Sequence, residues 1–301
     1  NFNSNDEIIV PSISFVAVAS SVIKSGAKLI LCDVEKNSLN TNADLISQKI
    51  SKNTKAVILN HYGGVSCEMD PIIDLCRENN IFLIEDSACA VRSFYKDKAV
   101  GTLGDMGIWS FDSMKTICTG DGGMIFLKDN ILRNKAKELL YLGIPPKKKS
   151  GLDSANLDNN NWWQIEVNAL GRRSIMNNIS GAIGLVQLNK LESFLSRRKE
   201  IHEMYMRELS DVQWLILPPI FNKYKQSSYY FFWIQLEKRD ELAKFLLEND
   251  IYTTFRYWPL NKINYFKKTN EALINTDWIS KSTLNLPMHQ SLTNEDVAKV
   301  I

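Results

Sequence analysis

Short apolar runs alternate with amphipathic segments along the first part of the chain. Six runs have strand length and are rich in isoleucine, leucine, valine and phenylalanine: Ile8–Val10, Leu29–Cys32, Ala56–Leu59, Phe82–Ile84, Gly107–Phe111 and Met124–Leu127. Strands that are buried on both faces of a sheet have this composition. Helical signals occupy four further segments: Val16–Ser25, Ala43–Ile50, Pro71–Asn80 and Ile131–Leu140. The alternation predicts an α/β fold whose central sheet is mostly parallel, with right-handed crossovers.

The third helical segment carries its own start signal. Asp70 suits the N-cap, and Pro71 suits the first helical position, where a backbone N–H has no helical partner. Asn79 and Asn80 suit the end of the helix. We therefore expect this helix to begin at Pro71.

The pattern changes after the sixth apolar run. Residues 143–161 contain two prolines, three consecutive lysines and an Asn-rich stretch, and predict a long loop. A helix is expected from about Asn178 to Met206, where apolar residues recur at helical spacing. The remainder mixes a strand, a helix and a second strand: Tyr229–Leu236, Asp240–Asn249 and Ile251–Phe255. We expect a large α/β domain over residues 1–195 and a small C-terminal α+β domain over residues 196–301.

Composition and charge exclude several classes of protein. Hydrophobic residues make up 45% of the 301 residues and charged residues 23%, so a substantial core can form without disulfides. The net charge is only +2, which indicates no general attraction to nucleic acid or to a membrane surface. No stretch approaches the length of a membrane span.

Cysteines and histidines predict neither a disulfide framework nor a metal site. The five cysteines are odd in number, scattered and without a CxxC pair, which fits a reducing cytoplasm. The three histidines do not stand at metal-ligand spacing from each other or from a cysteine. The chain opens without methionine, almost at once in a strand-like run, and is expected to be N-terminally truncated.

Residues capable of chemistry follow two of the predicted strands. Asp86 ends the run that begins at Phe82, while Ser110 and then Lys115 follow the run that begins at Gly107. Ligands of open α/β sheets bind outside the carboxyl ends of the strands. A lysine that can form a Schiff base and a carboxylate that can pair with a pyridinium nitrogen suit pyridoxal phosphate (PLP).

Each of these residues also has an ordinary structural explanation. A strand-end acid such as Asp86 often caps the next helix, and most lysines are solvated. Phe15, after the first strand, could stack on a planar cofactor, but its residue type alone favours an ordinary core aromatic. The case for PLP therefore depends on Asp86 and Lys115 occurring together at strand ends.

Eight segments along nearly the whole chain resemble the DegT/DnrJ/StrS family of PLP-dependent aminotransferases, which act mainly on nucleotide-linked sugars. The matching segments, in family order, are Asp6–Ser12, Gly26–Lys28 leading to Asp33-Val34, His61–Gly64, Glu85–Ala88, Ser110-Phe111 with Lys115, Gly120–Met124, Gly181–Leu185 with Gln187-Leu188, and Leu286–His289. The serine–lysine and glutamate–aspartate segments are the most specific.

The resemblance implies a fold, a cofactor and a set of site residues. The fold is the aspartate-aminotransferase type (fold type I), working as a homodimer with shared active sites. Lys115 is implied as the Schiff-base lysine, Asp86 as the partner of the pyridinium nitrogen and Ser110 as a ligand of the cofactor phosphate. Phe15 is implied to stack on the ring, which reverses the preference for a core residue.

Three features depart from the family pattern. The glycine–threonine helix start that usually precedes the first strand here, and whose amides bind phosphate, is absent from the sequence. Cys89 stands where the family usually has glutamine or histidine against the phenolic oxygen of the cofactor, and a thiol is a weak donor. Arg173 occupies the place of an asparagine that reaches the phosphate of the neighbouring subunit, where arginine could bind phosphate or another substrate group.

The resemblance implies an aminotransferase of sugar biosynthesis, for cell-surface polysaccharide or natural products. L-Glutamate is the expected amino donor and a nucleotide-linked keto-deoxysugar the expected acceptor, in the cytoplasm. A sugar dehydratase of the same family is the nearest alternative, but those members replace the lysine with histidine, so Lys115 argues against it. A non-catalytic binding or regulatory homologue is the other alternative, which Asp86 and Lys115 oppose.

Overall fold

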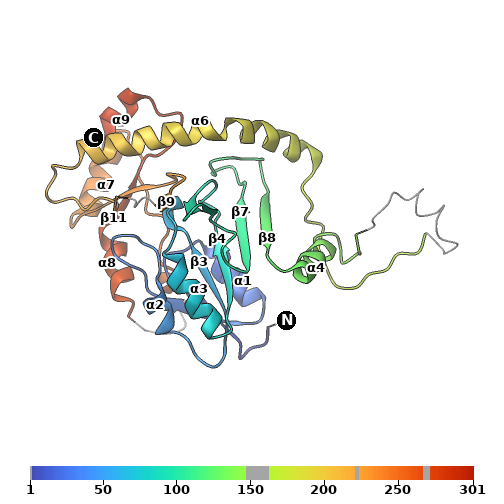
Figure 1. Cartoon of the computed structure of the whole chain (residues 1–301). Coiled ribbons are helices and arrows are strands. Elements are labelled where there is room, and N and C mark those ends of the chain that lie inside the picture. Colours follow the sequence, from blue (N-terminus) through green and yellow to red (C-terminus); the bar gives the residue numbers. More distant parts are fainter. Residues whose placement is uncertain (1, 147–162, 221–223, 267–271) are drawn as a thin grey trace.

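The structure, a computed structural model, describes residues 2–146, 163–220, 224–266 and 272–301. Its centre is a six-stranded sheet in the order β2-β1-β3-β4-β7-β8 (Figure 1). The strands are β1 (Glu7–Pro11), β2 (Lys28–Cys32), β3 (Thr54–Asn60), β4 (Phe82–Asp86), β7 (Met106–Ser110) and β8 (Gly123–Leu127). All neighbouring pairs are parallel except β7 and β8, so the mostly parallel sheet predicted from the sequence is confirmed.

Helices cover both faces of this sheet, as apolar strands require. Helix α1 (Val16–Lys24) covers one face, and α2 (Ala43–Ser47) and α3 (Met69–Glu78) cover the other. Helix α4 (Asn130–Leu140) follows β8 and has no buried residue. Ile9 of β1 packs into a core shared with α2 and α3, whereas its neighbours Ile8 and Val10 pack into a second core with α1. The alternation of side chains along a strand thus places the two cores on opposite faces.

The predicted start of α3 is wrong. The helix begins at Met69 with Glu68 at the N-cap, so Asp70 and Pro71 lie inside its first turn. Met69 is completely buried in the core, and this tertiary contact extends the helix beyond its local start signal. Asp70 forms an ion pair with Lys96. Lys96 lies in the turn between the short strands β5 (Phe94–Tyr95) and β6 (Lys98–Ala99).

The C-terminal part packs around the long helix α6 (Asn178–Glu208). A further core joins the second half of α6 to an antiparallel pair, β10 (Phe232–Gln235) and β11 (Thr283–Leu286). The remaining elements are β9 (Lys225–Gln226), α7 (Arg239–Glu248), α8 (Ile274–Ser282), α9 (Asn294–Val300) and the 3₁₀ turns η1 (Tyr62–Gly64) and η2 (Leu260–Lys262). The expected domain boundary at residues 195 and 196 falls inside α6.

Two predictions for the later part of the chain meet different outcomes. The strand expected over Ile251–Phe255 is wrong, since the segment has only an isolated bridge between Thr254 and Asn285. The loop predicted over residues 143–161 lies outside the described residues from position 147 onward. Within the described part of the chain, no helix has the length and apolar character needed to cross a bilayer.

Candidate active site

A cavity of about 500 Å³ opens at the carboxyl edge of the central sheet. The last residues of three strands line it: Asn60 of β3, Asp86 of β4 and Ser110 of β7. Asn60 and Asp86 are also direct neighbours in the register of β3 and β4. Parallel strands therefore deliver an amide, a carboxylate and a hydroxyl to one rim, where open α/β sheets bind ligands.

Asp86 is a carboxylate in an environment that disfavours its charge. Burial raises the pKa of Asp86 above its ordinary value, and the backbone N–H of Ala88 and the ammonium of Lys115 oppose that shift. The N–H of Ala88 donates to Oδ1 at 3.0 Å. A cationic ligand beside Asp86 would stabilise its ionised form.

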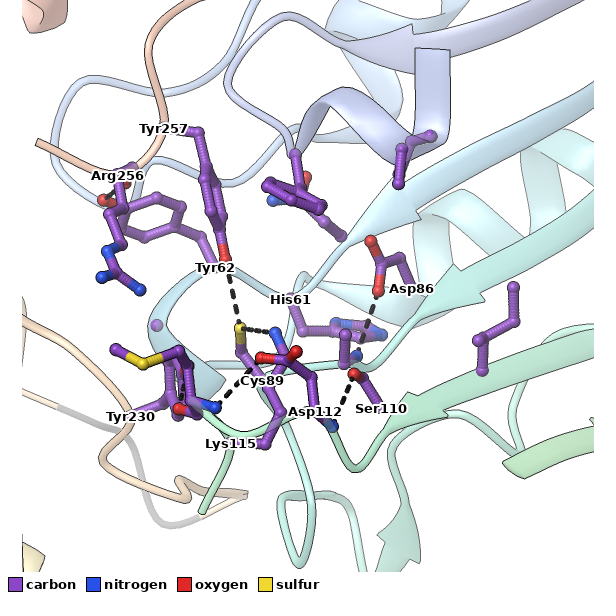
Figure 2. Close-up of a pocket in the computed structure, with 18 of the residues that line it drawn as sticks. His61, Tyr62, Asp86, Cys89, Ser110, Asp112, Lys115, Tyr230, Arg256 and Tyr257 are labelled. Carbon is purple, nitrogen blue, oxygen red and sulfur yellow. Dashed lines mark hydrogen bonds between the residues drawn. The ribbon is translucent and has the colours of Figure 1, made fainter. Parts of the chain in front are cut away.

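Lys115 enters the same cavity from the loop after β7 (Figure 2). Its Nζ lies 3.6 Å from the Cys89 sulfur and 5.4 Å from the centre of the Tyr230 ring. The loop is held by the N–H of Lys115, which donates to the carbonyl of Asp112 at 2.9 Å, and by the Tyr230 hydroxyl, which donates to the Met114 carbonyl at 2.8 Å. The amine is thus presented to the cavity by an ordered turn.

Cys89 stands between Lys115 and the far wall of the cavity. Its sulfur is 3.5 Å from the Tyr257 hydroxyl, and the dashed contacts in Figure 2 link Tyr257, Cys89 and Lys115 in a row. Burial raises the pKa of the Cys89 thiol, and the charge of Lys115 only partly offsets that effect. The side chain is therefore a neutral thiol at pH 7.

Phe15 and Ser110 complete the set of predicted residues around the cavity. Phe15 lines it with 51% of its surface exposed, so the core role that its residue type favoured is wrong. Its ring lies 5.5 Å from the ring of Tyr257. Ser110 Oγ accepts a hydrogen bond from the N–H of Asp112 at 3.3 Å, which ties it to the loop of Lys115.

Arg173 lies apart from these residues. It is exposed on the segment before α6, bridges to Tyr141 at the end of α4, and places its guanidinium 5.8 Å from the Tyr141 ring centre. It is absent from the lining of the cavity in the described residues. The structure therefore gathers Phe15, Asp86, Cys89, Ser110 and Lys115 in one place, and Arg173 elsewhere.

A buried histidine–glutamate pair, of which His61 lines the cavity, had no role in the sequence-based prediction. His61 Nε2 lies 3.1 Å from Glu85 Oε2, and both side chains are fully buried. His61 Nδ1 accepts from the N–H of Cys67 at 3.2 Å, which assigns the ring proton to Nε2. Since His61 and Glu85 stand 24 positions apart, only the pairing of β3 and β4 brings them together.

The Glu85 carboxylate also organises the loop before β7. It accepts backbone N–H bonds from Gly101 at 2.8 Å, Leu103 at 2.7 Å and Gly104 at 2.6 Å. Desolvation opposes its charge, but the bonds from His61, Gly104 and Gly101 outweigh it and hold the pKa of Glu85 below its usual value. The residue next to Asp86 in sequence is therefore a buried anion that holds both the loop before β7 and His61 in the wall of the cavity.

The sequence profile of the DegT/DnrJ/EryC1/StrS aminotransferase family matches residues 1–301. The chain belongs to this family. It is 45% identical to a dTDP-4-dehydro-2,3,6-trideoxy-D-glucose 4-aminotransferase of Saccharopolyspora spinosa, over 98% of this chain and 76% of that one.

Solved structures agree with the family assignment. The aminotransferase TlmJ from Streptoalloteichus hindustanus is 41% identical, with a TM-score of 0.92, over 100% of this chain and 78% of that one. The PLP form of Spr1654 from Streptococcus pneumoniae matches with a TM-score of 0.88 over 99% of this chain and 79% of that one. At 22% identity this second match shows the fold alone.

The side chains around the cavity fit the cofactor expected for this aminotransferase family. A buried carboxylate with a raised pKa needs a cationic partner, which a protonated pyridine nitrogen supplies. Asn60 Oδ1 is buried beside it without a hydrogen-bond partner among the described residues. Lys115 offers an amine, Phe15 an exposed ring and Ser110 a hydroxyl to the same space, whose volume suits a small organic molecule.

Proposed function

We propose that the protein is a PLP-dependent aminotransferase that moves an amino group from L-glutamate to a nucleotide-linked keto-deoxysugar. The observation that carries this proposal is the meeting of Asp86 and Lys115 in one cavity, in a chain of an aminotransferase family. The name of the 45% identical relative favours a dTDP-linked acceptor that is aminated at C4. Formation of cell-surface or natural-product amino sugars is the corresponding role.

Each residue of the cavity has a distinct task in this reaction. PLP, when bound, supplies an aldehyde that links to amines and a ring that withdraws electrons. Asp86 would hold the proton on the ring nitrogen, because a carboxylate stabilises an adjacent cation. Lys115 Nζ would hold the cofactor and then move the proton at the substrate carbon. Ser110 would donate to the phosphate, and Phe15 would pack against the ring.

Cys89 gives this cavity an unusual neighbour for the lysine. A neutral thiol brings no negative charge to Lys115 Nζ, in contrast to a carboxylate at the same place. The Tyr257 hydroxyl, 3.5 Å from the sulfur, is the nearest polar group behind it. We assign Cys89 and Tyr257 to the wall that faces the phenolic oxygen of the cofactor.

A homodimer is part of the proposal, because one side of the molecule leaves apolar side chains uncovered. We define the open face as the exposed apolar residues of β8, α4 and the first half of α6, which share one side of the molecule in Figure 1: Met124, Ile125, Ile131, Leu132, Ile179, Ile183, Leu185, Val186 and Leu188. Ile131 is 78% and Ile179 76% exposed. A patch of this kind marks an interaction site, and a second copy of the chain is the proposed occupant.

The open face adjoins the active site, which explains why a partner copy would matter for activity. Gln187 of α6 accepts a hydrogen bond from the N–H of Cys118, in the loop that follows Lys115, at 3.4 Å. Arg173 stands beside Tyr141 at the end of α4, next to the same face. We propose that Arg173 reaches the cofactor or substrate phosphate of the partner subunit.

Domain organisation and location complete the proposal. The core that α6 shares with β10 and β11 draws its buried residues from the C-terminal part of the chain, which supports a large domain over residues 1–195 and a small one over 196–301. Trp233 of β10 belongs to a separate core that includes Tyr62 of the large domain. The cysteines at positions 32, 67, 76, 89 and 118 are unpaired, which supports a reducing cytoplasm.

The test supplies the purified protein with PLP, L-glutamate and a panel of dTDP- and GDP-linked 3-keto and 4-keto sugars. Mass spectrometry should detect an amino sugar with at least one dTDP-linked acceptor. Lys115→Ala should lose both this product and the covalent fixation of PLP by borohydride, whereas the exposed control Lys244→Ala should keep both. No product with any acceptor, or fixation that survives in Lys115→Ala, would show the proposal to be wrong.

A further inference from the structure

Arg256 is a second cationic residue of the cavity, and the residue roles proposed above give it no ligand. It lines the same space as Lys115, Asp86 and Tyr257. Among the described residues, its guanidinium has neither an ion-pair partner nor a hydrogen-bond acceptor. Arginine offers a rigid fork of donors that matches a carboxylate or a phosphate. A free guanidinium in a substrate cavity therefore points to an anionic group of a substrate.

Hydrogen bonds hold the backbone of Arg256, although no described residue pairs with its guanidinium. Its N–H donates to Oδ1 of Asn285 at 2.8 Å, and its carbonyl accepts a hydrogen bond from the Tyr62 hydroxyl. Asn285 and Tyr62 are themselves buried, and Asn285 Nδ2 also donates to the Tyr62 hydroxyl at 3.4 Å. A side chain presented from such a base loses less freedom on binding than one on a mobile loop.

The guanidinium and the Lys115 amine share one neighbour, Tyr230. Lys115 Nζ lies 5.4 Å from the centre of the Tyr230 ring. Burial raises the pKa of the Tyr230 phenol, and the positive charge of Arg256 is one of the influences that oppose this shift. Arg256 therefore lies close enough to act electrostatically on the phenol. In Figure 2 the Arg256 side chain extends from the wall of Tyr257 toward Tyr230. The two cations thus border the same part of the cavity.

The chemistry of the two substrates decides which anion Arg256 meets. In L-glutamate the α-carboxylate is bonded to the reacting carbon, and the γ-carboxylate is a short flexible chain away. In a 4-keto nucleotide sugar the diphosphate is attached across the sugar ring from the reacting carbon. Because Arg256 borders the space next to Lys115, we propose that it binds a carboxylate of the amino donor. This inference rests on the proposed function and adds the residue that selects the donor.

The experiment uses the PLP-loaded protein with Arg256→Gln and Arg256→Lys, and Arg77→Gln as the exposed surface control. Two quantities are measured separately: calorimetric binding of glutarate, a dicarboxylate that cannot react, and kcat/KM for L-glutamate in the first half-reaction. Arg256→Gln should lower both by at least about 30-fold, the range expected when charge-assisted hydrogen bonds are lost. Arg256→Lys should recover part of the loss, because it keeps the charge without the fork.

The acceptor and a second donor sharpen the result. The KM for the nucleotide sugar should stay within about twofold of wild type in both variants, since the acceptor does not use the guanidinium. L-Alanine has only the α-carboxylate, so a loss shared by alanine and glutamate identifies the α-group, and a loss confined to glutamate identifies the γ-group.

The opposite pattern overturns the inference. If the KM for the nucleotide sugar rises while glutarate binding is unchanged, Arg256 is a phosphate ligand; if neither changes, Arg256 binds no substrate. If wild-type protein binds glutarate but transfers no amino group, only the proposed function is refuted. The role of Arg256 can still be tested in that case, because the glutarate titration compares its variants without any reaction. Circular dichroism and the melting temperature of Arg256→Lys establish that the fold is retained.

Discussion

Replacing Glu85 with glutamine tests whether a buried anion holds His61 and the loop before β7 in place. Each carboxylate oxygen accepts two hydrogen bonds: Oε2 from Gly101 N–H and His61 Nε2, and Oε1 from the N–H groups of Leu103 and Gly104. Glutamine has one oxygen and one NH₂ group. In either orientation the NH₂ group faces two donors, which lose their acceptor in a buried place.

The magnitude follows from those two lost acceptors. A buried donor without an acceptor costs about 1–3 kcal/mol, so Glu85→Gln should destabilise the protein by about 2–6 kcal/mol at pH 7. Folded proteins have a free energy of unfolding of about 5–15 kcal/mol, so this loss would be a large part of the total stability. The loop cannot easily turn away, because Gly101 holds its N–H on the carboxylate with φ of +94°, a conformation that favours glycine.

Acid should reduce the difference in the free energy of unfolding between wild type and Glu85→Gln. The folded-state pKa of Glu85 lies below its usual value of 4.5, so its contribution to stability is complete above pH 4.5 and is lost as the pH falls through the lowered pKa. Glutamine does not titrate. The gap between wild type and Glu85→Gln should therefore be full at pH 7 and narrow below about pH 4.5.

Urea unfolding measures this effect, with tryptophan fluorescence and circular dichroism recorded together. Coincident transitions by the two probes allow the midpoint shift to be converted into a free energy. Glu78→Gln, at the exposed end of α3, is the matched control and should change stability by less than about 0.5 kcal/mol. The reasoning is refuted if Glu85→Gln behaves like this control at pH 7, or if the gap persists unchanged in acid.

Further substitutions test the other parts of the site. Asp86→Asn should lower the turnover rate by about 100-fold while changing PLP affinity less, measured by steady-state kinetics and a PLP titration; near-native turnover contradicts the role of the carboxylate. Arg173→Ala should lower kcat/KM, and Arg173→Lys should lower it less because the charge remains; identical kinetics in all three proteins contradict a contact across subunits. Ile179→Asp should shift the protein toward monomer in sedimentation velocity, because it places a charge on the open face; an unchanged dimer shows that α6 lies outside the interface.

Local pattern was enough to predict the strands and the helices between them. Strands β1, β3 and β4 are covered by helices on both faces, so they appear in the sequence as uninterrupted apolar runs. A polar residue at the end of β3, β4 and β7 marks the ligand edge. Asp86 and Ser110 are such residues, and Lys115 follows in the next turn. The placement of the main chemical groups was therefore predictable without a structure.

Contacts between distant residues could not be read in the same way. The buried position of Met69 moved the start of α3, and the bridge between Thr254 and Asn285 replaced a predicted strand. The same segment carries Arg256 into the cavity, from a part of the chain about 140 residues after Lys115.

By itself, the sequence determined the α/β architecture and the acid and lysine at the ends of its strands, because burial leaves a periodic trace in the local order of residues. Only the tertiary structure decided that Glu85 pairs with His61 and that Arg256 stands near Tyr230 with no acceptor among the described residues. Exposure, charge pairing and electrostatic environment are properties of neighbours in space, and the order of residues along a strand does not encode which distant side chain will become such a neighbour.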